Sequence, residues 1–347
     1  MSLLFLALLP LLALFHLVMW FAYTSTLFRP ETGNMKRIGY LVGFEDRKAI
    51  LQAEEPQTGF TLLPTEHLAN AQVSTVIFGD SFAPSLGKAY SLKTGEPVGL
   101  VGINWSRKNG LSQIRQWLAD GWFRTHGVKT VVVERVEYAW LETFSEAGDA
   151  SLNVSWDQEL AGGVSEHDVK ASRWSFANNG NFKVLLCNAA YLFSPTAFNM
   201  TDACMVTLQK KFFTCSYGNK LLFYRGDMKG ALTARNQAAL EKALANIRDL
   251  NALCQQQGLK LCLIVPPVKS ELYYDWIEHP FYPESKLLET LQTRARDSGY
   301  VDVRQVLHEQ LEKGVQDLYY PDDEHWNFPA AQLAAEELAK AMQAPRN

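Results

Sequence analysis

The chain has 347 residues, of which 47% are hydrophobic, and its formal net charge at pH 7 is −4. This length and apolar content suffice for a sizeable core in one main domain, and the slightly acidic charge argues against a nucleic-acid partner. The five cysteines show no CxxC spacing, which argues against a zinc site.

Residues 1–28 contain an apolar stretch long enough to cross a bilayer. Leu3 to Phe28 holds no Asp, Glu, Lys or Arg, and at about 1.5 Å per residue a helix of this length exceeds the ~30 Å hydrocarbon core. The alternatives are a buried core helix and a cleaved signal peptide, but no basic segment precedes the apolar stretch. We therefore expect a single-pass transmembrane anchor. Arg29, Lys36 and Arg37 follow it, so that a positive-inside count keeps the domain cytoplasmic and charge alone leaves the orientation open.

Residues 29–72 are expected to form a stalk that leads from the membrane to the first strand, with no visible chemistry. From residue 73 onward, short apolar runs alternate with amphipathic patterns, which is typical of a parallel sheet covered by helices. The predicted strands are Val73–Phe78, Val98–Ile103, Lys129–Val136, Lys260–Val265 and Tyr300–Val303. The predicted helices are Ser112–Phe123, Ala234–Gln257, Glu284–Ser298 and Ala330–Met342. These elements indicate an α/β domain over residues 73–342.

The first predicted strand ends in Gly79-Asp80-Ser81. By itself this tripeptide is ordinary turn chemistry, with glycine for an unusual backbone angle and Asp or Ser as a helix cap. Its position is more informative, because open α/β sheets bind their ligands at the carboxyl ends of their strands. Ser81 is therefore a candidate nucleophile at the edge of the sheet.

The segment Asp322-Asp323-Glu324-His325-Trp326 lies just ahead of the last predicted helix. Acidic residues there favour a helix amino terminus, but a helix cap needs no imidazole. A serine hydroxyl becomes an effective nucleophile when a histidine takes its proton and a carboxylate orients that histidine. We predict a triad of Ser81 and His325 with either Asp322 or Asp323.

About 120 residues separate the third and fourth predicted strands, far more than a simple crossover needs. The inserted stretch, about 143–227, is rich in aromatic residues such as Trp156, Trp174 and Phe212. It is expected to form a small β-rich core; a lid or groove whose exposed rings stack on sugars is the alternative.

Lys269 and Tyr273 follow the fourth predicted strand and therefore lie at the same carboxyl edge as Ser81. We expect them to line a groove for the acceptor of the reaction, with an ordinary surface position as the alternative.

The two motifs, in this order along the chain, resemble those of the SGNH (GDSL) hydrolase superfamily. The segments Val265–Tyr273, Val133–Glu137 and His325-Trp326 are similar to its acetyltransferase branch, that of the alginate O-acetyltransferases AlgJ and AlgX. DltD-like membrane-anchored proteins have a similar layout of one amino-terminal helix and an extracytoplasmic SGNH domain. The resemblance implies a flavodoxin-like three-layer sandwich with a five-stranded parallel sheet, together with an inner-membrane location and a periplasmic catalytic domain.

Members of this superfamily usually carry an asparagine after the third strand as an oxyanion-hole donor, whereas the corresponding region here contains none. The backbone N–H of Ser81 and that of Gly110 are the candidate donors instead, because Asn109-Gly110 resembles the glycine block of the family; a plain turn is the alternative for this pair. Arg135 is a further candidate that would supply positive charge, although an ion pair with Glu134 or Glu137 also explains it.

The predicted function is a membrane-anchored serine O-acyltransferase that requires no cofactor or metal. Ser81 would carry an acyl group, expected to be acetyl, and pass it to hydroxyl groups of an extracytoplasmic polysaccharide. The resemblance implies that a multipass membrane-bound O-acyltransferase partner delivers the donor. The alternatives are a carbohydrate or lipid esterase with the same triad and a non-catalytic polysaccharide-binding or assembly protein.

Overall fold

The computed structural model describes residues 2–20, 35, 47–102, 110–145, 203–224, 226–228 and 236–343. Strands are labelled β, α-helices α and short 3₁₀ helices η. In chain order, the elements are α1 (Ser2–Met19), α4 (Arg47–Ala53), β1 (Leu62–Pro64), α5 (Thr65–Leu68), β2 (Thr75–Gly79), α6 (Ala83–Thr94), β3 (Val98–Gly102), α7 (Gly110–Ala119), α8 (Trp122–Thr125), β4 (Thr130–Glu134), α9 (Glu137–Ser145), β5 (Ala203–Thr207), β6 (Lys220–Tyr224), α13 (Gln237–Gln256), β7 (Lys260–Ile264), α14 (Lys269–Leu272), η2 (Tyr274–Trp276), α15 (Leu287–Arg294), η3 (Arg296–Ser298), β8 (Tyr300–Val301), α16 (Val303–Glu312) and α17 (Phe328–Gln343).

The main sheet has six parallel strands in the order β1-β3-β2-β4-β7-β8. The α/β class and all five predicted strands are confirmed, and β3-β2-β4-β7-β8 follow the doubly wound order 2-1-3-4-5. The expected number of strands is wrong, because β1 adds a sixth at the edge. This strand is the short segment Leu62–Pro64, and its proline argues against a strand when only the sequence is considered.

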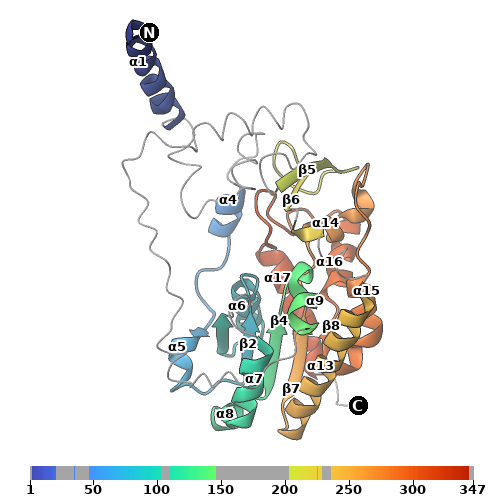
Figure 1. Cartoon of the computed structure of the whole chain (residues 1–347). Helices are drawn as coiled ribbons and strands as arrows, with labels where there is room; N and C mark the ends of the chain where they lie inside the picture. The colour runs from blue at the N-terminus through green and yellow to red at the C-terminus, as the bar shows by residue number, and fades with distance from the viewer. Residues whose placement is uncertain are drawn as a thin grey trace.

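Two cores lie on the two faces of this sheet, which gives the three layers visible in Figure 1. Successive residues of β2 alternate between them, so that Ile77 belongs to the core shared with α6, α16 and α17, whereas Phe78 belongs to the core shared with α7, α8 and α13. Every residue of β2 and β4 is buried, as expected for central strands with helices on both faces. The order of the strands reverses at β2, and such a switch point is where open α/β sheets place ligands.

Part of the predicted stalk, residues 29–72, belongs to the domain. β1 pairs with β3, with Leu62 opposite Val98, and α5 packs beside these strands. α4 lies against the segment that carries His325, with Glu55, just beyond its end, bonded to the Tyr320 hydroxyl at 2.7 Å. The boundary expected at residue 73 therefore falls too late in the chain.

The predicted aromatic insertion contains an antiparallel pair of strands, β5 and β6. Phe223 lies in β6, and it is buried with Phe212 and Phe213 in the same core as Ile77 of the main sheet, so these rings do not form a separate small core. Residues 146–202, which include Trp156 and Trp174, lie outside the described residues.

The predicted transmembrane anchor, residues 1–28, is described only over positions 2–20. This part forms the apolar helix α1, which contains Pro10. Within the described ranges, no helix combines the length and the apolarity needed to cross a bilayer. The membrane span stays a prediction from the sequence.

Candidate active site

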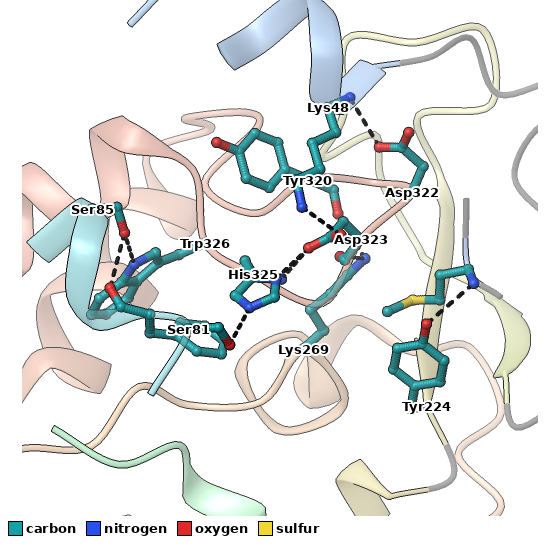
Figure 2. A network of polar contacts seen from close by, with 12 residues as sticks. Lys48, Ser81, Ser85, Tyr224, Lys269, Tyr320, Asp322, Asp323, His325 and Trp326 are labelled. Atoms are coloured by element: carbon teal, nitrogen blue, oxygen red, sulfur yellow. Dashed lines mark hydrogen bonds and ion pairs between the residues drawn. The ribbon is translucent and has the colours of Figure 1, made fainter. Parts of the chain in front are cut away.

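Ser81 and His325 meet at the carboxyl edge of the sheet. Ser81 follows β2 and comes two residues before α6, whereas His325 comes three residues before α17. The Nε2 atom of His325 lies 2.5 Å from the Ser81 Oγ atom, as Figure 2 shows. Ser81 is exposed, so that a substrate can reach its hydroxyl.

Asp323 is the aspartate that contacts the imidazole. Its Oδ1 atom lies 2.5 Å from His325 Nδ1 and also accepts the backbone N–H of His325 at 3.0 Å. Burial opposes the ionisation of Asp323, but His325 and Lys48 outweigh burial and hold the pKa of this carboxyl well below its usual range. Asp322 instead points to α4, where its Oδ1 accepts the backbone N–H of Lys48 at 3.0 Å.

Lys269 holds the loop that carries these residues in place. Its ammonium is buried and donates to the carbonyl oxygens of Tyr320, Pro321 and Asp323 at 2.8, 3.1 and 3.1 Å. Burial lowers the pKa of Lys269 to about 8, although Asp322 and Asp323 oppose this effect. The expectation that Lys269 lines an open acceptor groove is wrong, because its side chain points into the protein.

The prediction that Tyr273 lines an acceptor groove is also wrong. Its side chain is fully buried and packs against the rings of Phe212 and Tyr319, at centroid distances of 5.3 and 6.4 Å. A ring enclosed in this way contributes to the core and does not line a groove.

A buried glutamate supports the turn that presents Ser81. Glu134, the last residue of β4, accepts the backbone N–H of Asp80 at 2.9 Å. A Cβ atom on Gly79 would lie 2.4 Å from Glu134 Oε2 and 2.5 Å from the Ala83 Cβ, so this position requires glycine. Burial, and then the neighbouring Asp80, raises the pKa of Glu134 well above its usual range. The close approach of Glu134 and Ala83 thus explains why the Gly-Asp-Ser motif begins with glycine.

Arg135 forms its ion pair with Asp80, at 3.1 Å, and not with either glutamate expected from the sequence. The backbone N–H of Val136 donates a second hydrogen bond to the same Asp80 Oδ2 atom, at 3.2 Å. Arg135 also donates to the hydroxyl of Thr143 at 3.0 Å. These bonds join the turn before Ser81 to the end of β4 and place the guanidinium against Asp80, the residue before the nucleophile.

Among the described residues no hydrogen bond from the Ser81 N–H is found, and this N–H stays the first candidate donor to a developing oxyanion. The amino terminus of the twelve-residue helix α6 lies two residues away and adds a favourable dipole. Gly110 is the first residue of α7, the helix that follows β3. Asn109 lies outside the described residues.

Aromatic rings limit the freedom of the imidazole. Phe82 lies 4.7 Å from His325 between ring centroids, and it also contacts Trp326 edge-on at 5.4 Å. The Trp326 indole N–H donates to the Ser85 hydroxyl at 2.7 Å, which ties the histidine loop to α6.

Two residues of this site, Lys48 and Glu134, were not predicted from the sequence to belong to it. A charged residue at the carboxyl end of an otherwise apolar strand is unusual when both faces are covered, and this signal identifies Glu134. No comparable signal marks Lys48, which lies in a short amphipathic stretch far from both motifs. Among the described residues, no group of three or more His, Cys, Asp or Glu side chains is arranged to hold a metal ion.

Asp227, next to the end of β6, should make the stability of the protein pH-dependent. Burial, and then the charge of Glu324, raises its pKa to about 8, whereas an unfolded aspartate titrates near 3.9. The folded state therefore keeps a proton between about pH 4 and pH 8 that the unfolded state releases, and its contribution to stability is lost as the pH rises through this window. Glu137 and Glu271, with pKa values raised by burial to about 7 and about 8, act in the same direction.

We expect Asp227→Asn to reduce the fall in the free energy of unfolding between pH 5 and pH 8. Asparagine keeps the acceptor for the Tyr224 backbone N–H, which lies 3.2 Å from the carboxylate, and removes only the titration. Urea unfolding at several pH values measures the slope, and Asp249→Asn, at an exposed aspartate, is the control. Equal slopes for wild type and Asp227→Asn would contradict the assignment.

Residues 219–347 match the family model described as the SGNH hydrolase-like domain of the acetyltransferase AlgX. This segment includes Lys269, Asp323 and His325 but not Ser81, and the match confirms the AlgX-like resemblance inferred from the motifs. A search of curated proteins found no match, and neither did a search of solved structures.

Proposed function

Because residues 219–347 match the SGNH hydrolase-like domain of the acetyltransferase AlgX, we propose that the chain is a serine O-acyltransferase. Ser81 accepts an acyl group, in the first instance acetyl, and transfers it to a hydroxyl of a polysaccharide. The observation that carries this proposal is the position of His325, whose two ring nitrogens lie 2.5 Å from Ser81 Oγ and from Asp323 Oδ1.

In the first half-reaction, Nε2 of His325 takes the Ser81 proton as Oγ attacks the acyl carbonyl of the donor. Asp323 keeps the second nitrogen protonated and stabilises the imidazolium that forms. The Ser81 N–H, with Gly110 as the proposed second donor, supports the oxyanion of the tetrahedral intermediate. The intermediate then collapses, the leaving group receives the proton from His325, and an acyl ester remains on Ser81.

In the second half-reaction, the acceptor hydroxyl gives its proton to His325 and attacks the same carbonyl carbon. Collapse breaks the bond to Ser81 Oγ, which regains a proton from the imidazolium. The exposed position of Ser81 suits an acceptor as large as a polymer.

We extend the proposal to the setting of the reaction, by analogy with the resembled family. Residues 1–28 anchor the protein in a membrane, the domain faces the periplasm, and a multipass membrane-bound O-acyltransferase supplies the acyl group. The support for an anchor is compositional, because α1 is apolar and its described leucine side chains, such as Leu11 and Leu14, are exposed.

An esterase is the second candidate function. The same exposure of Ser81 that admits a polymer also admits water, and water as the final acceptor turns the transferase into a hydrolase. The residues of the triad serve both reactions.

The test uses the full chain in detergent, an activated acetyl ester as donor, and a panel of oligosaccharides as acceptors. We expect an acetylated peptide that contains Ser81 by mass spectrometry, and acetate transferred to at least one oligosaccharide. Acetate release that no acceptor alters would favour the esterase. Absence of any adduct on Ser81, with either the ester or a fluorophosphonate, would contradict both catalytic functions.

A further inference from the structure

Helix α4 brings a lysine into contact with the aspartate of the proposed triad. The Lys48 ammonium lies 2.7 Å from Asp323 Oδ2, and the Lys48 backbone N–H donates to Asp322 Oδ1 at 3.0 Å (Figure 2). Lys48 thus contacts both aspartates of the motif, although it lies more than 270 positions earlier in the chain.

The Oδ2 atom of Asp323 needs a hydrogen-bond donor such as the Lys48 ammonium. Its Oδ1 atom is occupied by the imidazole and the backbone N–H of His325, which leaves Oδ2 as the free end of the carboxylate. Only 23% of this side chain is exposed, so water replaces a lost partner poorly. With both oxygens bonded, the carboxylate cannot rotate away from His325.

Neighbouring contacts hold α4 in register on the loop. Arg47 pairs with Asp317 at 3.4 Å, and Glu55 bonds the Tyr320 hydroxyl at 2.7 Å and pairs with Lys88 at 3.1 Å. An isolated surface ion pair contributes little, because solvent screens it and both side chains lose freedom. Here the helix that carries Lys48 is fixed on both sides, so the position of the ammonium costs little additional entropy.

We propose that Lys48 is a positioning residue of the active site, which holds Asp323 in the orientation that His325 requires. The proposal rests on the proposed function and adds to it that the segment before the SGNH-like sheet completes the site. Lys48 touches no reacting atom; it acts through Asp323.

The charge around Asp323 comes from several elements. On its own loop lie Asp322, Glu324, His325 and Tyr320; β6 contributes Tyr224, α14 contributes Lys269, and α4 contributes Lys48. Lys269 is held by carbonyl oxygens of the loop, so Lys48 is the cation among these groups that bonds the carboxylate itself. Removal of Lys48 should therefore let the Asp323–His325 pair retain its proton to higher pH.

The experiment compares full-length Lys48→Met, Lys48→Arg and Lys88→Met, with Ser81→Ala as the inactive reference. We expect Lys48→Met to lower kcat for release of an activated acetyl ester about tenfold or more, with KM changed less than twofold. The acid limb of its pH–rate profile should move to higher pH, and Lys48→Arg should restore most of both effects. Lys88→Met removes the other lysine that anchors this segment, and it should lower the melting temperature without moving the pH profile.

Two outcomes separate this inference from the proposed function. Wild-type kcat and pH profile in Lys48→Met, with Ser81→Ala inactive, would overturn the role of Lys48 and leave the acyl transfer intact. An active Ser81→Ala variant would instead overturn the acyl transfer. If Lys48→Met has a much lower melting temperature than Lys88→Met, its loss of activity could reflect unfolding, and Lys48→Gln then replaces it in the test. Glutamine removes the charge and keeps a hydrogen-bond donor of similar length. A wild-type pH profile in Lys48→Gln would contradict the positioning role of Lys48.

Discussion

Replacement of Ser81 by alanine should lower kcat for acyl release by roughly 10⁴–10⁶ and leave the fold intact. The Oγ atom is the only non-hydrogen atom removed, and it lies on an exposed turn whose backbone is held by Glu134 and Asp80. The rate with an activated acetyl ester and the melting temperature measure the two effects. No acyl adduct should form on the variant.

Ser85→Ala is the matched control for this experiment. Ser85 lies one helical turn further along, and its hydroxyl accepts the Trp326 indole N–H and donates to the carbonyl of Phe82 at 3.0 Å. Loss of the Ser85 hydroxyl should slow the reaction less than tenfold, because this hydroxyl only helps to hold the loop of His325 and does not attack the acyl carbon. A Ser81→Ala variant that retains wild-type turnover, or a Ser85→Ala variant that is equally inactive, would contradict the assignment of the nucleophile.

Asp323→Asn should lower kcat by about 10⁴, the effect expected when an amide leaves the histidine in the wrong tautomer. Asp322→Asn should be far milder, within about tenfold, because asparagine still accepts the Lys48 backbone N–H. Turnover of the two variants with the same ester, corrected for the folded fraction, gives the comparison.

The two aspartates are neighbours of nearly identical chemistry, so the ratio of their effects tests the geometry directly. Comparable losses in both variants would indicate that the loop and not the contact at Nδ1 determines activity. A larger loss in Asp322→Asn would transfer the orienting role to Asp322.

The sequence alone determined the elements whose signals are local. Short apolar runs marked the five predicted strands of the sheet, because strands covered on both faces are mostly apolar. The position of Ser81 followed from the same logic, since a residue just after a central parallel strand reaches the carboxyl edge. The pairing with His325 rested on chemistry, because the acidic residues before it can favour the start of a helix, whereas a helix cap needs no imidazole.

Tertiary structure alone decided which groups complete the site. Asp322 and Asp323 are adjacent residues of the same type, so the sequence does not tell their roles apart. The backbone of the loop, which the buried Lys269 holds in place, directs Asp323 to His325 and Asp322 to α4. Burial of Lys269 and Tyr273 likewise depends on how that loop closes over α14. Lys48 reaches Asp323 because two segments distant along the chain meet in space, and the spacing of residues along a sequence carries no information about such a contact.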